Sequence, residues 1–179
     1  MRSTMSEAAD EVDHAAVEEI ILQSYLFAGF PRALNAARAW RAVSGEAAPT
    51  EDEEASVNDL ATWRDRGEET CAIVYGDHYE RLRQNIRDLH PALDEWMIVD
   101  GYGKVLSRPG VDLRTRELCV VAACAVSGQQ RQLHSHLHGA LNVGASVGEV
   151  AAVLDALSDL ISRDDLSRYR QLLQKVAAA

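Results

Sequence analysis

The chain has 179 residues, of which 47% are hydrophobic and 26% charged, and its formal net charge is −10. These values are typical of one globular domain with a buried core, and the acidic balance argues against nucleic acid or an anionic membrane as the main partner. No stretch reaches the roughly 18 apolar residues that a membrane-spanning helix needs, and the acidic N-terminus lacks a secretory pattern. The three cysteines, an odd number, fit a reduced protein, so we expect a cytoplasmic location.

The first 43 residues are predicted to form an N-terminal helical element. Residues 1 to about 12 are expected to be disordered or frayed, and a helix should then run from about Val12 to Phe27. Gly29-Phe30-Pro31 interrupts this helix, which resumes with Pro31 near its first turn and continues to about Val43. Residues 44–58 are acidic, poor in large apolar residues and interrupted by Pro49, which predicts an exposed linker.

Residues 59–179 are predicted to form a helical core, and the whole chain one structural domain. Glycine, proline and capping residues mark the expected helix ends, and Ser146 with Glu149 is typical of a capping box. No alternation of apolar and polar residues indicates a strand, so we predict an all-α fold. The expected helices cover about 60–67, 68–74, 78–89, 91–105, a segment around Glu117, a segment from 129 to a stop at Gly144, a segment from about 147, and about 164–176.

Glu117 enters an otherwise apolar helix. The nine residues from Leu118 to Val126 are all apolar or cysteine, which covers every side of a helix and predicts burial. Because Glu117 shares a stripe with Cys124, its carboxyl should be at least partly desolvated. Burial favours the neutral form of a carboxyl unless an arginine folds over it. The candidate arginines are Arg114, Arg116 and Arg131.

The next helix carries three histidines close to its apolar stripe. His134 and His136 flank the stripe on opposite sides, whereas His138 lies farther round toward solvent or a partner chain. A buried carboxyl and an imidazole at the stripe edge, on consecutive helices, can form an acid/base pair that works near neutral pH. The alternative interpretation is a structural hydrogen bond between Glu117 and His136, since buried polar groups pair in any case.

The spacing of the cysteines and histidines weighs against redox and metal chemistry. Cys119 and Cys124 point about 140° apart on one helix and cannot form a disulfide there. The cysteines are predicted to be small core residues, with a reactive Cys124 as the weaker alternative. His134 and His138 have the spacing of two metal ligands, but no third ligand is indicated nearby, so we predict no metal.

Several sequence runs resemble the carboxymuconolactone decarboxylase family, which belongs with the alkylhydroperoxidase D-like proteins. The resemblance covers about residues 91–157 and includes the runs Arg114-Thr115-Arg116-Glu117-Leu118, Gln132-Leu133-His134-Ser135-His136 and Gly139-Ala140-Leu141-Asn142-Val143-Gly144, followed by Glu149. Residues 17–35 resemble the family's tyrosine and glycine-phenylalanine-proline helix pair, which in ordinary members follows the histidine helix. The resemblance therefore implies an all-α, alkylhydroperoxidase D-like fold in a permuted order.

The resemblance also implies an activity. In the thiol-peroxidase branch of the superfamily, a Cys-x-x-Cys pair occupies the positions of Gln129 and Gln132, and an amide cannot replace a thiolate nucleophile. The decarboxylase branch lacks that pair and keeps the glutamate and histidine, which correspond to Glu117 and His136. The implied function is a decarboxylase-like lyase that acts on a small carboxylated lactone or related carbon acid.

The implied roles follow from this assignment. Glu117 would be the general acid/base and His136 would hold or relay the proton, while Arg131 and His134 recognise a carboxylate and Cys124 lines the site. The family resemblance implies a homo-oligomer, trimeric or hexameric, and we predict no cofactor. The alternatives are a peroxidase that uses Cys124 or Cys119, and a non-catalytic oligomeric module of the same fold.

Overall fold

The computed structural model describes residues 2–52, 54 and 59–178, and the regular structure in these residues is entirely helical. This confirms the predicted all-α fold. None of the described helices has both the length and the apolar character needed to cross a bilayer. The elements are α1 (Arg2–Glu11), α2 (His14–Ala28), α3 (Phe30–Ser44), α5 (Leu60–Tyr75), the 3₁₀ turn η1 (Gly76–His78), α6 (Tyr79–Leu89), α7 (Pro91–Trp96), the π-helix η2 (Met97–Leu106), α8 (Leu113–Val126), α9 (Gln130–Asn142), α10 (Val147–Ala156) and α11 (Arg163–Ala177).

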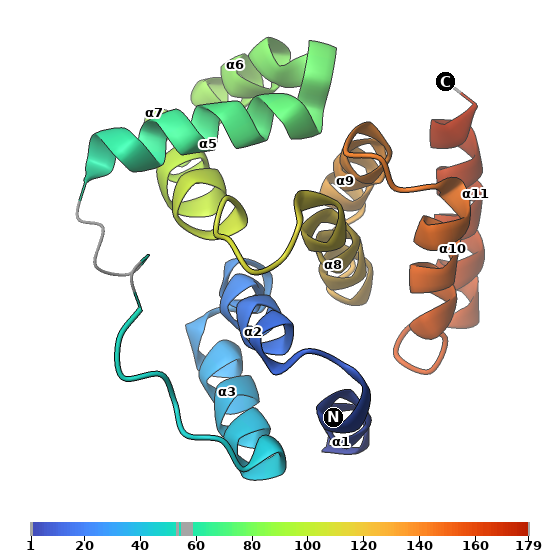
Figure 1. Cartoon of the computed structure of the whole chain (residues 1–179). Coiled ribbons are helices and arrows are strands. Elements are labelled where there is room, and N and C mark those ends of the chain that lie inside the picture. Colours follow the sequence, from blue (N-terminus) through green and yellow to red (C-terminus); the bar gives the residue numbers. More distant parts are fainter. Residues whose placement is uncertain (1, 53, 55–58, 179) are drawn as a thin grey trace.

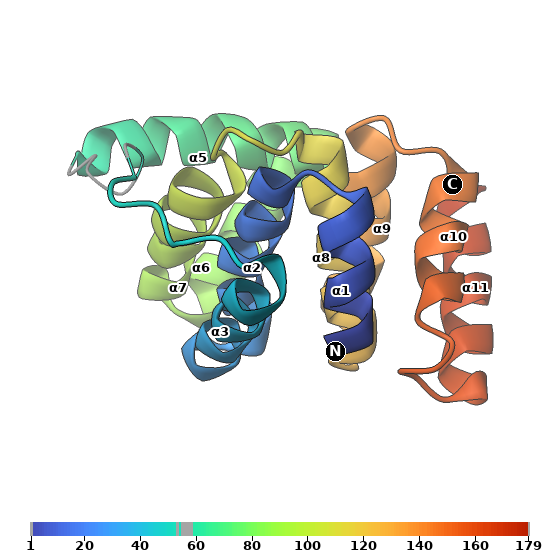
Figure 2. The same ribbon diagram turned by 60° about the horizontal axis from the view of Figure 1, so that its bottom comes forward.

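The helices α8 and α9 pack against each other at the centre of the molecule. The pair α10 and α11 lies along one flank of this centre, and α5 with α6, α7 and η2 forms the opposite side (Figure 1). The N-terminal helices occupy a third side, where α2 contacts α8 and η2 (Figure 2). The largest buried cluster is built from the inner faces of α5, η2, α8, α9, α10 and α11.

The N-terminal segment differs from its prediction at the start. Residues 1 to about 12 were expected to be disordered or frayed, but Arg2–Glu11 form α1, which packs on α3. Good helix formers such as alanine, glutamate and methionine favour this helix, and the contact with α3 stabilises it. The break that separates α2 from α3 falls at Gly29, whose φ is 83°, with Pro31 in the first turn of α3, as predicted.

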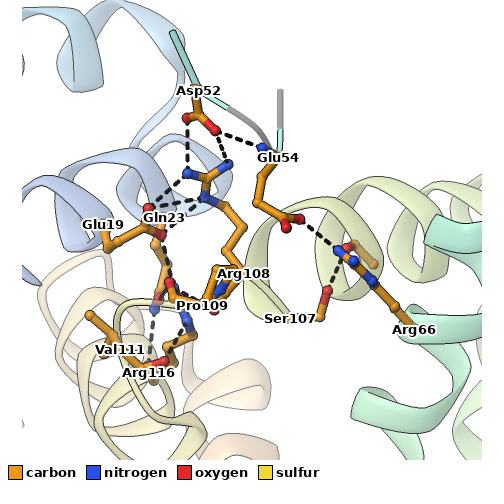
Figure 3. A network of polar contacts seen from close by, with 11 residues as sticks. Glu19, Gln23, Asp52, Glu54, Arg66, Ser107, Arg108, Pro109, Val111 and Arg116 are labelled. Atoms are coloured by element: carbon orange, nitrogen blue, oxygen red, sulfur yellow. Dashed lines mark hydrogen bonds and ion pairs between the residues drawn. The ribbon is translucent and has the colours of Figure 1, made fainter. Parts of the chain in front are cut away.

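A buried arginine holds this N-terminal element against the core (Figure 3). Arg116 is only 1% exposed and donates hydrogen bonds to Glu19 at 2.8 Å and to Gln23 at 3.2 Å. The side-chain amide of Gln23 donates in turn to the backbone oxygen of Arg116 at 2.9 Å, and Arg108 donates a further hydrogen bond to Glu19 at 2.7 Å. Helix α2, which precedes the glycine-phenylalanine-proline turn, therefore packs against the core of its own chain.

Helix α5 and the π-helix η2 approach each other more closely than side chains permit. A Cβ atom at Gly67 would overlap the backbone oxygen of Ile98, and one at Gly103 would overlap the backbone oxygen of Trp63. The predicted break at Gly67 is therefore wrong: α5 runs unbroken, and its glycine serves a close helix contact. The single helix predicted over 91–105 is also wrong, because it changes to π geometry at Met97.

The later helix ends follow their capping signals. Ser146 and Glu149 form the predicted capping box at the start of α10, and Asp112 caps α8 by accepting a hydrogen bond from the Thr115 backbone at 3.0 Å. The apolar run of α8 predicted that this helix is buried on every side. That prediction is wrong, because one face is partly open. Leu118 is only partly buried and Val126 is 48% exposed.

Candidate active site

Glu117 and His136 meet in the interior between α8 and α9. The Oε2 atom of Glu117 and the Nδ1 atom of His136 share a hydrogen bond of 2.8 Å. Glu117 has no exposed surface and His136 is 6% exposed, so the imidazole is the member of the pair that reaches toward the outside. The predicted burial of Glu117 and its contact with His136 are confirmed, whereas their catalytic roles remain predictions.

The second oxygen of the carboxyl has no hydrogen-bond partner. Glu117 Oε1 is buried, yet none of the described residues donates to it or accepts from it. Leaving a buried polar atom unpaired costs about 1–3 kcal/mol, so such atoms are uncommon in folded proteins; among the described residues the Nε1 atom of Trp40 is also unpaired. Oε1 therefore keeps an unused acceptor position while Oε2 stays bonded to the imidazole.

Gly139 makes room for the carboxyl on the surface of α9. A Cβ atom at this position would lie 2.6 Å from Glu117 Oε2 and 2.7 Å from a methyl carbon of Val74. Both distances are shorter than van der Waals contacts allow, so the packing of Glu117 against α9 requires a glycine here. The glycine of the Gly-Ala-Leu-Asn run thus has a direct role in placing the acid.

Aromatic rings from other elements enclose the imidazole. The ring of Phe27 on α2 and the ring of Tyr75 on α5 both stand edge-on to His136, with centroid distances of 6.4 and 6.1 Å. Tyr102 on η2 packs against Tyr75 with a centroid distance of 6.2 Å. Such apolar walls exclude water and strengthen the electrostatic interactions inside the site.

The groups around Glu117 are weak acids that burial keeps protonated. Burial raises the pKa of the Cys71 and Cys124 thiols to about 12, and the charge of the Glu117 carboxylate adds to the effect at both. Burial likewise raises the pKa of Tyr75 and Tyr102 above the ordinary phenol range. These side chains can donate hydrogen bonds near neutral pH but do not supply thiolate or phenolate nucleophiles.

The three arginines near Glu117 in sequence do not fold over it. Arg116 turns toward Glu19, and Arg114 pairs with Glu149 at 3.1 Å. Arg131 is exposed at the start of α9 and lines a shallow cavity together with Tyr169 of α11.

The predicted carboxylate-binding residues do not converge. Arg131 faces α11, whereas His134 lines a different cavity beside Tyr75 and the start of α6. Cys124 is 1% exposed and belongs to the core. It lies near Glu117, as predicted from the helix stripe that the two residues share. Within residues 2–52, 54 and 59–178, no three histidine, cysteine or acidic side chains are grouped closely enough to hold a metal ion.

Tyr75 and Tyr102 are site residues that the sequence analysis missed. They come from α5, which packs on both η2 and α9, and from η2, which meets α5 at Gly67 and Gly103. No local spacing relates either tyrosine to His136. The two glycines were the available signal: Gly67 was predicted to end a helix, and the run from Gly101 to Lys104 was interpreted as a turn or a helix-packing element.

Comparison with known proteins supports the family resemblance. A model of the carboxymuconolactone decarboxylase family matches residues 95–160, which include both Glu117 and His136. The 4-carboxymuconolactone decarboxylase of Acinetobacter baylyi is 24% identical over 98 residues, covering 55% of this chain and 73% of that protein. Peroxisomal protein 2 of Schizosaccharomyces pombe is 30% identical over 135 residues, and the match spans 75% of this chain and 63% of that relative.

Proposed function

We propose that this chain, in which residues 95–160 belong to the carboxymuconolactone decarboxylase family, is an acid–base enzyme that decarboxylates a small carboxylated lactone or related carbon acid. The observation that carries the proposal is the buried hydrogen bond between Glu117 and His136, together with the unpaired Oε1 atom of Glu117. A proton can move between the two side chains over 2.8 Å.

The proposed reaction needs only proton transfer from the protein. The bond between the substrate carbon and its carboxylate breaks, CO₂ leaves, and the bonding electron pair passes into the adjacent carbonyl system as an enolate. A proton from the Glu117–His136 pair then forms the new C–H bond, and water returns a proton to the pair. A hydrogen bond from the pair to the enolate oxygen lowers the barrier, because preorganised donors stabilise developing charge.

The exposures of the two side chains support a division of roles. His136 is 6% exposed and Glu117 not at all, so we assign proton delivery to the imidazole, while Glu117 holds and orients it. The raised pKa of Cys124 and of the partly buried Cys119, in both cases through burial, argues against the peroxidase alternative, which requires a reactive thiolate.

The test is Glu117→Gln, assayed by CO₂ release from carboxylated lactones. Glutamine keeps the size of the side chain but cannot exchange a proton, so kcat should fall by about 10²–10⁴-fold, the usual contribution of general acid–base catalysis. Circular dichroism and thermal unfolding should show a folded protein. His136→Ala should lose activity to a similar extent.

The matched control is Glu80→Gln, which makes the same chemical change at an exposed site on α6. This variant should keep full activity. If Glu117→Gln and His136→Ala both retained the wild-type kcat on a confirmed substrate, the assignment would be wrong.

A non-catalytic module of the same fold is the second candidate. It is favoured by one observation: the cavity beside Tyr75 is lined by neither Glu117 nor His136. In that case Glu117→Leu should leave stability unchanged or raise it, since apolar replacement of a buried polar pair is often neutral or stabilising. No carboxylated lactone should then shift the melting temperature.

We also propose that the protein is a homo-oligomer, as the family resemblance implies. The partly open face of α8 supports this, since Leu118 and Val126 leave apolar surface on it, and so does α3, where Phe30 is 64% exposed. Light scattering after size-exclusion chromatography should give a mass that is a multiple of the chain's mass. A monomer at micromolar concentration would contradict this proposal.

A further inference from the structure

A cavity that neither Glu117 nor His136 lines lies beside Tyr75. Its volume is about 340 Å³, within the range of small-molecule sites, and it opens between the end of α5, the turn η1, α6 and α9. Tyr75 and Val74 form part of its wall, and the side-chain amide of Asn142 is held by a 2.8 Å hydrogen bond to the Val74 backbone oxygen. The cavity is thus a formed feature of the fold.

The charge of this cavity is opposite to that of the protein. The ionisable side chains that line it are Tyr75 from α5, His78 from η1, Arg81 from α6, and His134 and His138 from α9. None of the lining residues is an aspartate or glutamate, although the chain has 28 acidic residues and a net charge of −10. Within the described part of the chain, Arg81 forms no ion pair, so its guanidinium is available to a ligand.

The three imidazoles are close enough to influence one another. The rings of His134 and His138 are 5.0 Å apart between centroids, and those of His78 and His138 are 6.5 Å apart. Burial, followed by the neighbouring His134 and His78, lowers the pKa of His138. A bound negative charge would reverse this effect and favour protonation of the cluster.

We propose that this cavity is a binding site for a small oxyanion, a carboxylate or phosphate group, which Arg81 and the histidines 78, 134 and 138 hold together. A guanidinium matches the two oxygens of such a group, and protonated imidazoles donate further charge-assisted hydrogen bonds. The volume accommodates the anion together with a small organic body, and the walls of Val74 and Leu82 supply apolar contact for that body. This site is distinct from the acid–base pair and does not rest on the proposed catalytic function.

Anion binding and proton uptake are coupled at such a site. Burial and the neighbouring imidazoles disfavour the charged form of His138, whereas a guanidinium stays charged throughout the neutral range. As the pH falls toward about 6, the bound anion promotes protonation of His138, and the affinity rises by up to about tenfold per pH unit for the proton taken up. A site of fixed charge would show no such dependence.

The experiment is isothermal titration of the full chain with succinate and, separately, with inorganic phosphate, at about pH 6 and about pH 8. At least one anion should bind more tightly at the lower pH with net proton uptake, which is measured by repeating the titration in buffers of different ionisation enthalpy. The anion that binds more tightly identifies the carboxylate or the phosphate class. Absence of binding by both anions at the lower pH would overturn the proposal.

Two variants and a matched control locate the binding. Arg81→Gln should weaken the affinity about tenfold or more, the loss expected for a charge-assisted hydrogen bond, and His138→Gln should reduce the proton uptake. Arg38→Gln removes the same charge from an exposed site on α3 and should bind like the wild type. Equal losses in the Arg38 and Arg81 variants would show non-specific attraction and refute the site. Binding of Zn²⁺ that His138→Gln abolishes, without binding of either anion, would make it a metal site instead and also refute the proposal.

Discussion

Single residues determine whether the acid can sit in the core, and Gly139 is the clearest case. The carboxyl of Glu117 occupies the space that a Cβ atom at this position would take. Any larger residue must push the carboxyl away from α9 and disturb its 2.8 Å hydrogen bond to His136. The glycine is therefore as important to the candidate site as the acid itself.

Gly139→Ala should consequently lower both stability and activity. Overpacking of this kind costs about 1–3 kcal/mol of unfolding free energy, measured by urea denaturation, and kcat should fall with the displaced carboxyl. Gly148→Ala is the matched control, because the nearest atom to its added Cβ is 3.8 Å away and helix propensity favours alanine there. Equal stability of the Gly139 variant and the wild type would contradict the described packing.

The buried cysteines lead to a prediction about how thiol reactivity depends on pH. Because burial raises the pKa of Cys71 and Cys124 to about 12, neither thiol should react measurably with iodoacetamide in the native protein below about pH 9. Unfolding in guanidinium chloride restores ordinary thiol acidity, and all three cysteines should then react. Mass spectrometry of the alkylated chain distinguishes the two states, and rapid native labelling of Cys124 would revive the peroxidase alternative.

Among the contacts between helices, the contact of α5 with η2 requires glycine at both crossing positions. Both glycines at the crossing lie against backbone oxygen atoms, which cannot move aside as a flexible side chain can. This contact also brings Tyr75 and Tyr102 together beside His136, so a defect in it reaches the candidate site.

Gly103→Ala should therefore destabilise the protein by more than the roughly 1–3 kcal/mol typical of overpacking, because the neighbouring backbone must shift. Gly101→Ala lies in the same π-helix and would place its Cβ 3.9 Å from the nearest atom, an ordinary contact. The melting temperature should fall strongly for the first variant and little for the second. Similar melting temperatures for the two would disprove the close approach.

Elements also show which parts of the fold the sequence can predict. The capping box at Ser146 and Glu149 and the break at Gly29 are local signals, and both were predicted correctly. The meeting of Glu117 and His136 could be anticipated because their helices follow each other along the chain. The change to π geometry at Met97 and the unbroken course of α5 depend on contact between distant segments, which no local pattern encodes.

The same reason explains why two of the predicted binding residues lie apart. His134 and Arg131 were both expected to recognise a carboxylate, but they line different cavities, and the arginine that shares the cavity of His134 is Arg81 from α6. The docking of α6 beside α9 decides this, and sequence spacing carries no information about it. Helix α1 was missed for the same kind of reason, since its contact with α3 supports it.

At the scale of the whole molecule, the ion pair between Glu19 and Arg116 joins the N-terminal helices to the core. Burial acts to raise the pKa of Glu19, but hydrogen bonds from Arg108 and Arg116 outweigh this effect, and the pKa is lowered. A carboxyl with a lowered folded-state pKa stabilises the fold at pH values above its unfolded pKa, about 4.3. This stabilisation is lost as the pH falls through the folded-state pKa.

Glu19→Gln should accordingly reduce the free energy of unfolding at neutral pH, and the difference from wild type should shrink below about pH 4. Urea denaturation between about pH 3 and pH 7 measures this dependence. Glu7→Gln, at an exposed position on α1, should follow the wild-type curve. A difference between Glu19→Gln and wild type that is independent of pH would show that the ion pair does not contribute in this way.

The order of the helices along the chain has a consequence for its synthesis. Glu19 and Arg116 are 97 positions apart, so the ribosome releases the N-terminal helices long before the arginine that anchors them. At about 5–20 residues per second, translation of that interval takes roughly 5–20 seconds. During this delay the apolar side of α2, including Phe27, has no core to pack against. Chaperones can therefore bind the nascent chain at this stage.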